Sequence, residues 1–481
     1  MKRTYIIMAL AGFTMLSSCK KLIEITDTDL LAGGTALSQV TYVEQAVLGA
    51  YAGVSPDMGI LLNATFADEV AKAEFYNAVT THEWQYGPAD VGLRDNFPAI
   101  GPNYTIVNRV NLALAALPLA DSTKVGDETK RIRLKGELLF LRAYAHFELF
   151  RYYCDNYDPA GLAMPYMETS SIIGTPRIDM GTYFQKIIAD LAAAKPLVPN
   201  NVTDINRANV AAVAGMQARV ALYMRDWPAA ETFATEFINA VPLADTLAFP
   251  GIWTDANTAE QAFRVVRTST IGSRIGSLFR GTSASATNIG TVTWKPSDKL
   301  WTSYNQTTDF RFKSYLKLEP LQTGSREPRL IQKYAGPSLA PLYGTASENV
   351  ANGKILRTAE MVLIRAEARA EQTGKLTGAN SAESDINFLR RNRISGYVNV
   401  TFTSKQQAID EIMLERFKEL AFEGHRFFDL KRRGLPVSRL PQDAPSPAGT
   451  TLPAGNFRFL LPIPLPEITA NPVMQQNPGY Q

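Results

Sequence analysis

The sequence has few of the side chains that build metal sites and disulfide frameworks. Among 481 residues there are two cysteines, Cys19 and Cys154, and three histidines. Three histidines leave little for a histidine-rich metal site. Because Cys19 is expected to carry a lipid, as argued below, Cys154 has no partner for an intrachain disulfide. The aromatic stretch FRYYC around Cys154 predicts a buried and unreactive thiol.

The chain also lacks a strong net charge and the short motifs of common enzyme classes. Its formal net charge is +3, and a near-neutral balance gives no electrostatic footprint for nucleic acid. No HExxH, Walker A, GxSxG or paired CxxC motif occurs. Beyond the N-terminus, no apolar run reaches the roughly 20 residues that span a membrane. Nucleic-acid binding and a membrane-spanning helix are therefore not expected.

The N-terminus has the pattern of a bacterial secretion signal that ends in a lipobox. Two basic residues precede an apolar run over residues 5–16, and two serines lead into Cys19. The run is too short to span a membrane, and small residues precede the expected cleavage site. We expect residues 1–18 to be a cleaved signal peptide, Cys19 to be lipidated, and residues 19–40 to form a tether. Loss of the two basic residues leaves a charge of +1 on the mature chain.

Most of the remaining chain has apolar residues at helical spacing. The predicted helices cover residues 41–51, 103–117, 128–153, 179–194, 207–225, 227–240, 356–372, 381–393 and 405–422. Ala218, Ala230 and Pro242 each fall 12 residues apart. That is the small–small–Pro spacing of a tetratricopeptide repeat, in which small residues let two helices approach closely.

The composition divides residues 41–481 into three parts of one expected domain. Residues 41–241 form N-terminal helical repeats. Residues 242–352 are rich in Gly, Ser, Thr, Pro and aromatic residues, and they predict an irregular, ligand-binding region. Residues 353–481 return to helices and end in a proline-rich tail, which we expect to contain no helix.

Four stretches carry motifs of one known family. They are the lipobox LSSC, the segment FLRAYAHFELFRYY, the motif LERFKELAFEGHRFFDLKRRG at residues 414–434, and the C-terminal FLLPIPLPEITANPVMQQNPGY. The third is the most specific, and all four occur in the family's order. Together they resemble the SusD/RagB family of Bacteroidetes outer-membrane lipoproteins.

The resemblance implies a fold and a function. The fold is mostly α, with about four tetratricopeptide-like helix pairs as a scaffold and an irregular, loop-rich insertion packed against it. The function is that of a non-catalytic lipoprotein, anchored in the outer membrane through its lipid alone and facing the cell surface. Such a protein captures oligosaccharides and passes them to a TonB-dependent SusC-like β-barrel transporter. Some members are thought to handle peptides, so a peptide or another non-glycan nutrient is the alternative ligand. No cofactor is implied.

The motif at residues 414–434 also permits a catalytic interpretation. Glu415, Glu423 and His425 are acids and a base within a short span, which could support general acid–base chemistry in a secreted hydrolase. The structural interpretation is stronger, because acids and bases interleaved at helical spacing favour ion pairs with one another. We therefore expect no catalytic residue, and pairing of Glu415 and Glu419 with Arg416 and Lys418.

Glycan binding calls for flat aromatic rings beside polar side chains. Trp84 and Tyr86 lie in a polar stretch, THEWQYG, and Trp294 lies in the irregular region. We predict these three as sugar-stacking platforms, because the other tryptophans fall in segments expected to be buried. Those are Trp227, Trp253 and Trp301. The loop residues Arg274, Arg280 and Asn288 are weaker candidates for polar contacts.

A calcium site is possible but not indicated. Asp68, Glu69 and Asp298 could supply oxygen ligands, but they do not have the spacing of an EF-hand loop. We therefore predict no metal site.

Overall fold

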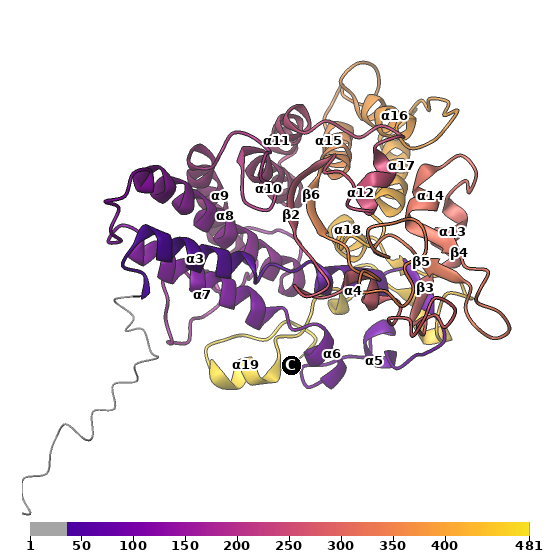
Figure 1. Cartoon of the computed structure of the whole chain (residues 1–481), viewed down its shortest axis with the longest axis horizontal. Coiled ribbons are helices and arrows are strands. Elements are labelled where there is room, and N and C mark those ends of the chain that lie inside the picture. Colours follow the sequence, from indigo (N-terminus) through magenta and orange to yellow (C-terminus); the bar gives the residue numbers. More distant parts are fainter. Residues whose placement is uncertain (1–35, 481) are drawn as a thin grey trace, which may run out of the picture.

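The structure, a computed structural model that describes residues 36–480, is built mainly of helices (Figure 1). The longer ones are α3 (Val40–Tyr51), α4 (Asp57–Phe66), α7 (Ile100–Ala116), α8 (Asp127–Tyr153), α9 (Met180–Ala194), α10 (Val210–Met224), α11 (Trp227–Ala240), α15 (Thr358–Glu371), α16 (Ala382–Arg391), α17 (Lys405–Glu419) and α18 (Arg426–Arg433). The shorter ones are α5 (Val79–His82), α6 (Val91–Asn96), α12 (Phe249–Trp253), α13 (Asp298–Ser303), α14 (Phe310–Tyr315) and α19 (Leu465–Ala470). Cys19 and the tether up to residue 35 lie outside the described residues.

All nine helices expected from apolar spacing are present, and their ends agree with the prediction to within three residues. Helix α4 was not predicted. Seven of its ten residues are buried, so it has no polar face and no amphipathic stripe that the sequence could show. No helix among the described residues is long and apolar enough to cross a membrane.

The helices form the expected scaffold of packed pairs. Helix α8 packs against α7 and α9, α10 against α11, and α15 against α11, α16 and α17, so the scaffold runs across the molecule in chain order (Figure 1). A short turn joins α10 to α11, and in it Asp226 caps α11 by accepting a hydrogen bond from the Ala229 amide at 3.2 Å. Ala218 and Ala230 are fully buried.

Four pairs of short antiparallel strands are present among the described residues, and the first two pairs below join segments that are distant in sequence. The pairs are β1 (Val70–Lys72) with β3 (Trp294–Pro296), β2 (Gln261–Val265) with β6 (Gly353–Arg357), β4 (Leu316–Leu318) with β5 (Arg329–Ile331), and β7 (Val437–Ser438) with β8 (Thr451–Leu452). In the first pair Val70 lies opposite Pro296 and Lys72 opposite Trp294. This pairing fixes the segment after α4 against the irregular region.

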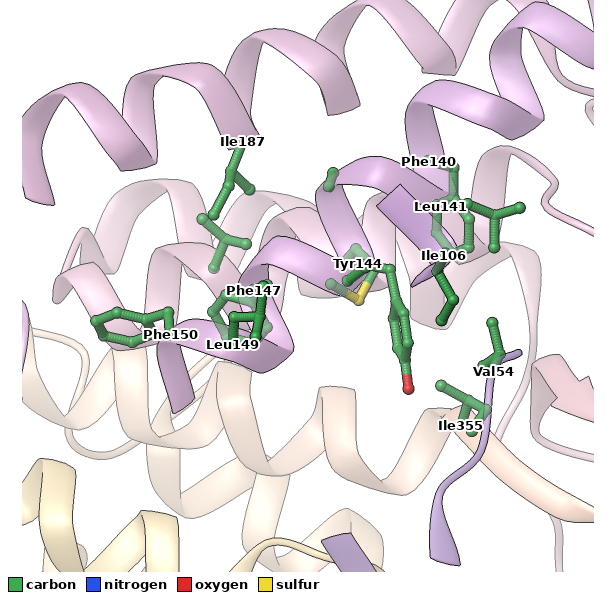
Figure 2. Close-up of a cluster of buried hydrophobic side chains, with 14 of the residues drawn as sticks. Val54, Ile106, Phe140, Leu141, Tyr144, Phe147, Leu149, Phe150, Ile187 and Ile355 are labelled. Atoms are coloured by element: carbon green, nitrogen blue, oxygen red, sulfur yellow. The ribbon is translucent and has the colours of Figure 1, made fainter. Parts of the chain in front are cut away.

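Helix α8 is the centre of the larger core (Figure 2). Nearly every residue from Leu134 to Tyr153 is buried, because other helices or the C-terminal tail cover all its faces. Gly136 is needed for the close approach of the Lys195–Leu197 turn, since a Cβ at Gly136 would lie 2.8 Å from the Leu197 Cβ. Cys154, directly after α8, is fully buried, and burial raises the pKa of its thiol. An unreactive thiol is the consequence.

The proline-rich tail packs onto the scaffold and is not wholly extended. Helix α19 lies within it (Figure 1), with the Leu465 amide at its start donating to the Pro88 carbonyl at 3.2 Å, so the expectation of no helix was wrong. Its two prolines, Pro464 and Pro466, sit at the N-cap and in the first turn, where a missing N–H costs nothing. Elsewhere the Leu461 amide donates to the Tyr152 carbonyl at 2.9 Å, so the tail covers the C-terminal end of α8.

Candidate functional site

The three aromatic residues predicted as sugar platforms lie in the interior. Trp84 is 4% exposed, Tyr86 is 2% exposed and Trp294 is 5% exposed. A ring without an exposed face cannot stack on a sugar, so this prediction is corrected. Trp253 is buried, as predicted, and Trp227 and Trp301 are partly buried.

Each of the three rings has structural partners. The Trp84 indole N–H donates to the Phe66 carbonyl at 2.9 Å, and the Arg439 guanidinium lies 4.3 Å from its ring centroid. The Tyr86 hydroxyl donates to the Arg458 carbonyl. The polar sequence THEWQYG led to the prediction that Trp84 and Tyr86 are exposed. The C-terminal tail covers this segment instead and supplies the contacts from Arg439 and Arg458.

The Trp294 ring is enclosed in the same way. Its centroid lies 4.9 Å from that of His82 and 6.0 Å from that of Tyr76, both at edge-to-face angles. The pairing of β3 with β1 brings these residues from the N-terminal half of the chain onto the tryptophan. That long-range contact is not visible in the local sequence.

The loop residues proposed for polar contacts are mostly engaged within the protein. Arg280 is buried and pairs with Glu348 at 2.5 Å, and Arg274 donates to the Glu348 carbonyl at 2.6 Å. Asn288 remains exposed in the loop. The two arginines therefore fix the loop onto residue 348 and are not free to bind a ligand.

The oxygen ligands considered for calcium are also occupied. Asp68 pairs with Arg426 at 2.8 Å and with Lys299 at 2.6 Å, while Arg329 pairs with Asp298. Burial raises the pKa of Glu69 to about 8, so this side chain is largely uncharged at neutral pH. Within residues 36–480 no group of three or more His, Cys, Asp or Glu side chains is arranged to hold a metal ion.

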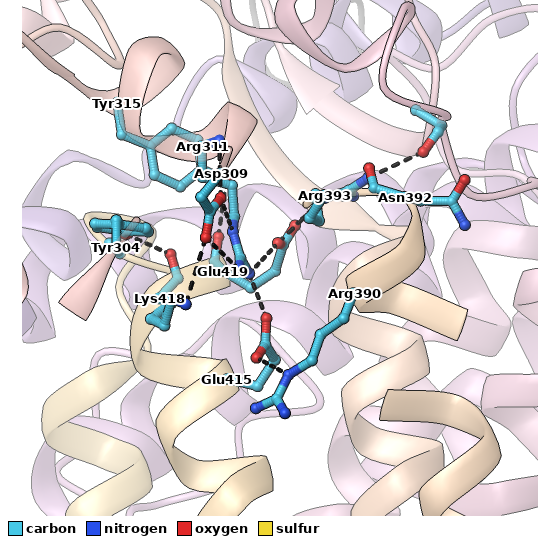
Figure 3. Close-up of polar contacts among 12 residues, drawn as sticks. Tyr304, Asp309, Arg311, Tyr315, Arg390, Asn392, Arg393, Glu415, Lys418 and Glu419 are labelled. Atoms are coloured by element: carbon cyan, nitrogen blue, oxygen red, sulfur yellow. Dashed lines mark hydrogen bonds and ion pairs between the residues drawn. The ribbon is translucent and has the colours of Figure 1, made fainter. Parts of the chain in front are cut away.

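The motif at residues 414–434 forms a buried network of charges (Figure 3). Glu419 lies 2.8 Å from Arg357, 3.1 Å from Arg393 and 3.1 Å from Arg311, and all four side chains are almost fully buried. Arg311 also contacts Glu415, whose second oxygen lies 2.6 Å from Arg390. This network joins α17 to the irregular region, to β6 and to the end of α16.

The predicted ion pairs of Glu415 and Glu419 with Arg416 and Lys418 are wrong, because these residues have other partners. Arg416 binds Asp429 at 2.7 Å, and Lys418 lies 3.3 Å from Asp309. Because other elements cover α17, its charged residues form ion pairs with residues of those elements instead of with one another. Burial raises the pKa of Glu415, but the charges of Arg311 and Arg390 outweigh it and lower that pKa to about 2. A carboxylate held ionised by arginines is a poor general acid, which favours the structural interpretation.

A groove opens where the helical scaffold meets the irregular region. It encloses about 330 Å³ between the start of α4, the end of α6, the start of α7 and one face of α8, and Leu278 of the irregular region completes its wall. We call this space the groove. Its lining residues are Gly53, Ser55, Asp57, Met58, Leu61, Asp95, Asn96, Pro98, Ala99, Pro102, Asn103, Ile106, Tyr144, Glu148, Tyr152 and Leu278.

The irregular region is fastened to the rim of the groove by Asp57. One carboxylate oxygen of Asp57 lies 3.4 Å from the Arg267 guanidinium, and the other accepts a hydrogen bond from the Ser273 hydroxyl. Arg267 also donates to the Ser55 hydroxyl at 3.2 Å. These contacts hold the segment that leads to Leu278 against the first turn of α4.

The floor of the groove comes from one face of α8. Tyr144, Glu148 and Tyr152 follow one another at a spacing of four residues, so they lie in one row along the helix. Each tyrosine is 4% exposed as a whole, and neither hydroxyl has a hydrogen-bond partner in residues 36–480, but neither hydroxyl oxygen is among the fully buried atoms. Burial raises the pKa of both hydroxyls, so both remain protonated at neutral pH.

The lining of the groove suits a ligand rich in hydroxyl groups. Three carboxylates, Asp57, Asp95 and Glu148, and the side-chain amides of Asn96 and Asn103 supply polar atoms, and no lysine, arginine or histidine is among the lining residues. Sugar hydroxyls both donate and accept hydrogen bonds, so they match carboxylates and free tyrosine hydroxyls together. Apolar patches from Met58, Leu61 and Ile106 offer surface for the C–H faces of a ring.

Sequence reasoning missed the groove and its floor. One signal was present: Glu148 stands between two tyrosines at helical spacing in a stretch of α8 that is mostly apolar and aromatic. A buried carboxylate in such a row needs a partner, and Arg151, one turn on, supplies it at 2.5 Å. The contribution of Asp57, Asp95 and Leu278 could not be read locally, because the fold brings them together.

Two family models match the chain, one in each half. The model of the SusD family matches residues 276–480, and a model described as "Starch-binding associating with outer membrane" matches residues 34–222. The chain belongs to the SusD family. Both matched segments contribute to the groove, since Leu278 lies in the first and the α4, α6, α7 and α8 residues lie in the second.

This SusD-family chain is similar to known proteins over most or all of its length. It is 25% identical to "SusD-like protein P2" of Formosa agariphila, covering 100% of this chain and 99% of that protein. A SusD superfamily protein from Bacteroides thetaiotaomicron has a similar structure, with a TM-score of 0.76 and 21% identity over 92% of this chain and 100% of that one. A "Laminarin binding SusD-like protein" is similar with a TM-score of 0.70 and 19% identity, over 92% and 99% of the two chains.

Proposed function

We propose that this protein is a non-catalytic lipoprotein of the outer membrane that captures oligosaccharides or polysaccharide fragments at the cell surface. It delivers them to a TonB-dependent SusC-like β-barrel transporter, the partner that the family implies. The groove is the capture site. The observation that carries this proposal is the row Tyr144–Glu148–Tyr152 on the floor of the groove, whose two tyrosine hydroxyls have no hydrogen-bond partner within residues 36–480 and are not fully buried.

Hydroxyls that are open to the groove and have no partner in the protein are available to bind a polar guest. A sugar supplies the missing partners, while the apolar patches of the groove contact its ring. The carbohydrate named for a structural relative agrees with this class of ligand.

A peptide with basic or amine groups is the second candidate ligand. The groove is lined by three carboxylates and by no cationic side chain, although Arg267, Arg94 and Arg151 pair with these carboxylates from outside the lining, so a cationic peptide would compete with them. The glycan proposal predicts binding to polysaccharides, whereas the peptide alternative predicts binding to basic peptides.

Retardation in affinity electrophoresis tests the proposal. The protein without its lipid is run through gels that contain neutral plant, fungal and host polysaccharides, with bovine albumin as the control for sieving. We expect at least one polymer to retard it. If no polymer does so, and basic peptides bind instead, the glycan proposal is wrong.

The anchor is tested at the predicted lipobox. We expect Cys19→Ala to abolish palmitate labelling and to release the protein from the membrane fraction, because no described helix could hold it there. Cys154→Ala is the matched control and is expected to keep the label, since Cys154 is buried. Retention of Cys19→Ala in the membrane would contradict lipid anchoring.

A further inference from the structure

A small chamber lies beneath the groove. It has a volume of about 30 Å³ and is bounded by α4, α8, α10, β6 and the turn between α17 and α18. Ser55, Tyr144, Glu148 and Tyr152 line both the groove and the chamber, so the two spaces adjoin. The Tyr144 side chain extends from α8 towards Val54 and Ile355, with its hydroxyl at the far end (Figure 2).

The walls of the chamber carry polar groups that are not saturated within the protein. The Arg151 Nε is buried and has no hydrogen-bond partner within residues 36–480, and Arg151 as a whole is only 6% exposed. Tyr144, Tyr152 and His425 also line the chamber; none of their polar side-chain atoms is among the fully buried, unpartnered ones, and the nearer His425 nitrogen is 3.9 Å from a Glu360 oxygen. A buried donor such as the Arg151 Nε favours a polar guest.

Two glycines in the wall of the chamber, Gly59 and Gly424, leave no room for a side chain. A Cβ at Gly59 would lie 2.9 Å from the Tyr152 hydroxyl, and a Cβ at Gly424 would lie 3.1 Å from the Gly59 backbone. Gly424 also has a φ of 82°, which favours glycine. Side chains at these two positions would press into the wall of the chamber and displace the hydroxyl.

Each charged side chain that lines the chamber has an oppositely charged partner, including Glu423, which pairs with Arg357 and Lys333, both at 2.6 Å. Arg151 pairs with Glu148, Arg219 with Glu360 at 2.6 Å, and Lys354 with Asp255 at 2.7 Å. Burial lowers the pKa of His425 far below its usual value, so its ring is neutral. An ionic guest would therefore find no free counter-charge in the chamber and would be disfavoured. A neutral guest needs no counter-charge.

The size of the chamber limits the guest to about two non-hydrogen atoms, because one water molecule needs roughly 10–15 Å³ measured in this way. A hydroxymethyl group has one carbon and one oxygen, and its hydroxyl can accept from one wall and donate to the other. A methyl group would leave the polar walls without partners, and a carboxylate would add an unpaired charge.

We propose that the chamber is a subsite for the exocyclic hydroxymethyl group of a hexose bound in the groove. This inference rests on the proposed function. It makes the protein selective for neutral hexose polymers over pentose polymers and polyuronates.

The test uses the full chain in detergent and three classes of polymer in affinity electrophoresis. Neutral hexose polymers are a β-1,3-glucan, a β-1,4-glucan, an α-1,4-glucan and a β-1,4-mannan. Xylan lacks the hydroxymethyl group, and polygalacturonate carries a carboxylate in its place. We expect retardation by at least one hexose polymer and by neither xylan nor polygalacturonate.

Two hydroxyl-deletion variants examine the chamber itself. We expect Tyr152→Phe and Tyr144→Phe to weaken binding of the retarding hexose polymer at least about tenfold, equivalent to about 1.4 kcal/mol. Tyr397→Phe is the control, because its hydroxyl bonds to Asn387 at 2.8 Å in another part of the molecule. Its affinity should stay unchanged.

Each contrary result has a distinct meaning. Retardation by xylan or polygalacturonate would overturn the subsite while leaving glycan capture intact. Unchanged affinity in both folded tyrosine variants would show that the chamber holds water alone, and it would also overturn the subsite. No retardation by any polymer would overturn the proposed function, and the subsite with it.

Discussion

Replacing Glu419 by glutamine is expected to lower the free energy of unfolding by about 3–5 kcal/mol. The carboxylate of Glu419 meets three buried guanidiniums, those of Arg311, Arg357 and Arg393. Their charges hold its pKa well below the usual value, although burial opposes this. The neutral amide would leave three buried cations with one carboxylate fewer, and water cannot replace it.

The matched control is Glu128→Gln, which breaks an ion pair with Arg131 in which the Glu128 side chain is 67% exposed. Exposed pairs contribute about 0–1 kcal/mol, so this variant should unfold like the wild type. Chemical denaturation of both variants measures the difference. Equal stabilities would mean that the buried network of α17 contributes no more than a surface pair.

Trp84→Ala is expected to destabilise the fold by about 3–5 kcal/mol, the range for removing a large buried aromatic side chain. The substitution removes the ring beneath Arg439 and the hydrogen bond to the Phe66 carbonyl. An exposed, sugar-stacking tryptophan would behave in the opposite way. Its removal would abolish glycan binding and leave the stability of the fold unchanged.

Phe75→Ala provides the comparison for the tryptophan variant. The Phe75 side chain is 55% exposed, so its removal should change stability by at most about 0.5 kcal/mol. Thermal and chemical unfolding of the two variants would distinguish a buried structural tryptophan from an exposed one. A Trp84→Ala protein as stable as Phe75→Ala would contradict the structural role of Trp84.

The helical scaffold was predictable from the sequence because amphipathic spacing reports directly on which face of a helix is buried. Helix α8 and the α10–α11 pair are examples, and the spacing of small residues at Ala218 and Ala230 marked the latter. Helix α4 escaped because it is buried on nearly all sides. The short helix α19 escaped because prolines at a helix start look the same in sequence as prolines in an extended tail.

The candidate site was not predictable to the same degree, since its residues depend on long-range contacts. Trp84 and Trp294 stand in polar surroundings in the sequence, but the tail and the β1–β3 pairing bury them. The charged motif of α17 forms ion pairs, as expected from the sequence, but its partners come from α14, β6 and α16. The groove joins residues from four helices to one residue more than 120 positions further along the chain, and no local pattern reports such a meeting.

The central claim, that the groove captures glycan, is tested most directly by filling its mouth. Asn96 is exposed at the end of α6 and lines the groove, whereas Arg94 is exposed on the same helix and does not line it. The affinity of Asn96→Trp and Arg94→Trp for the polymer that retards the wild type is the measurement. The account predicts at least about a tenfold loss for Asn96→Trp and no change for Arg94→Trp. Wild-type affinity in a folded Asn96→Trp protein would contradict it and place the ligand elsewhere.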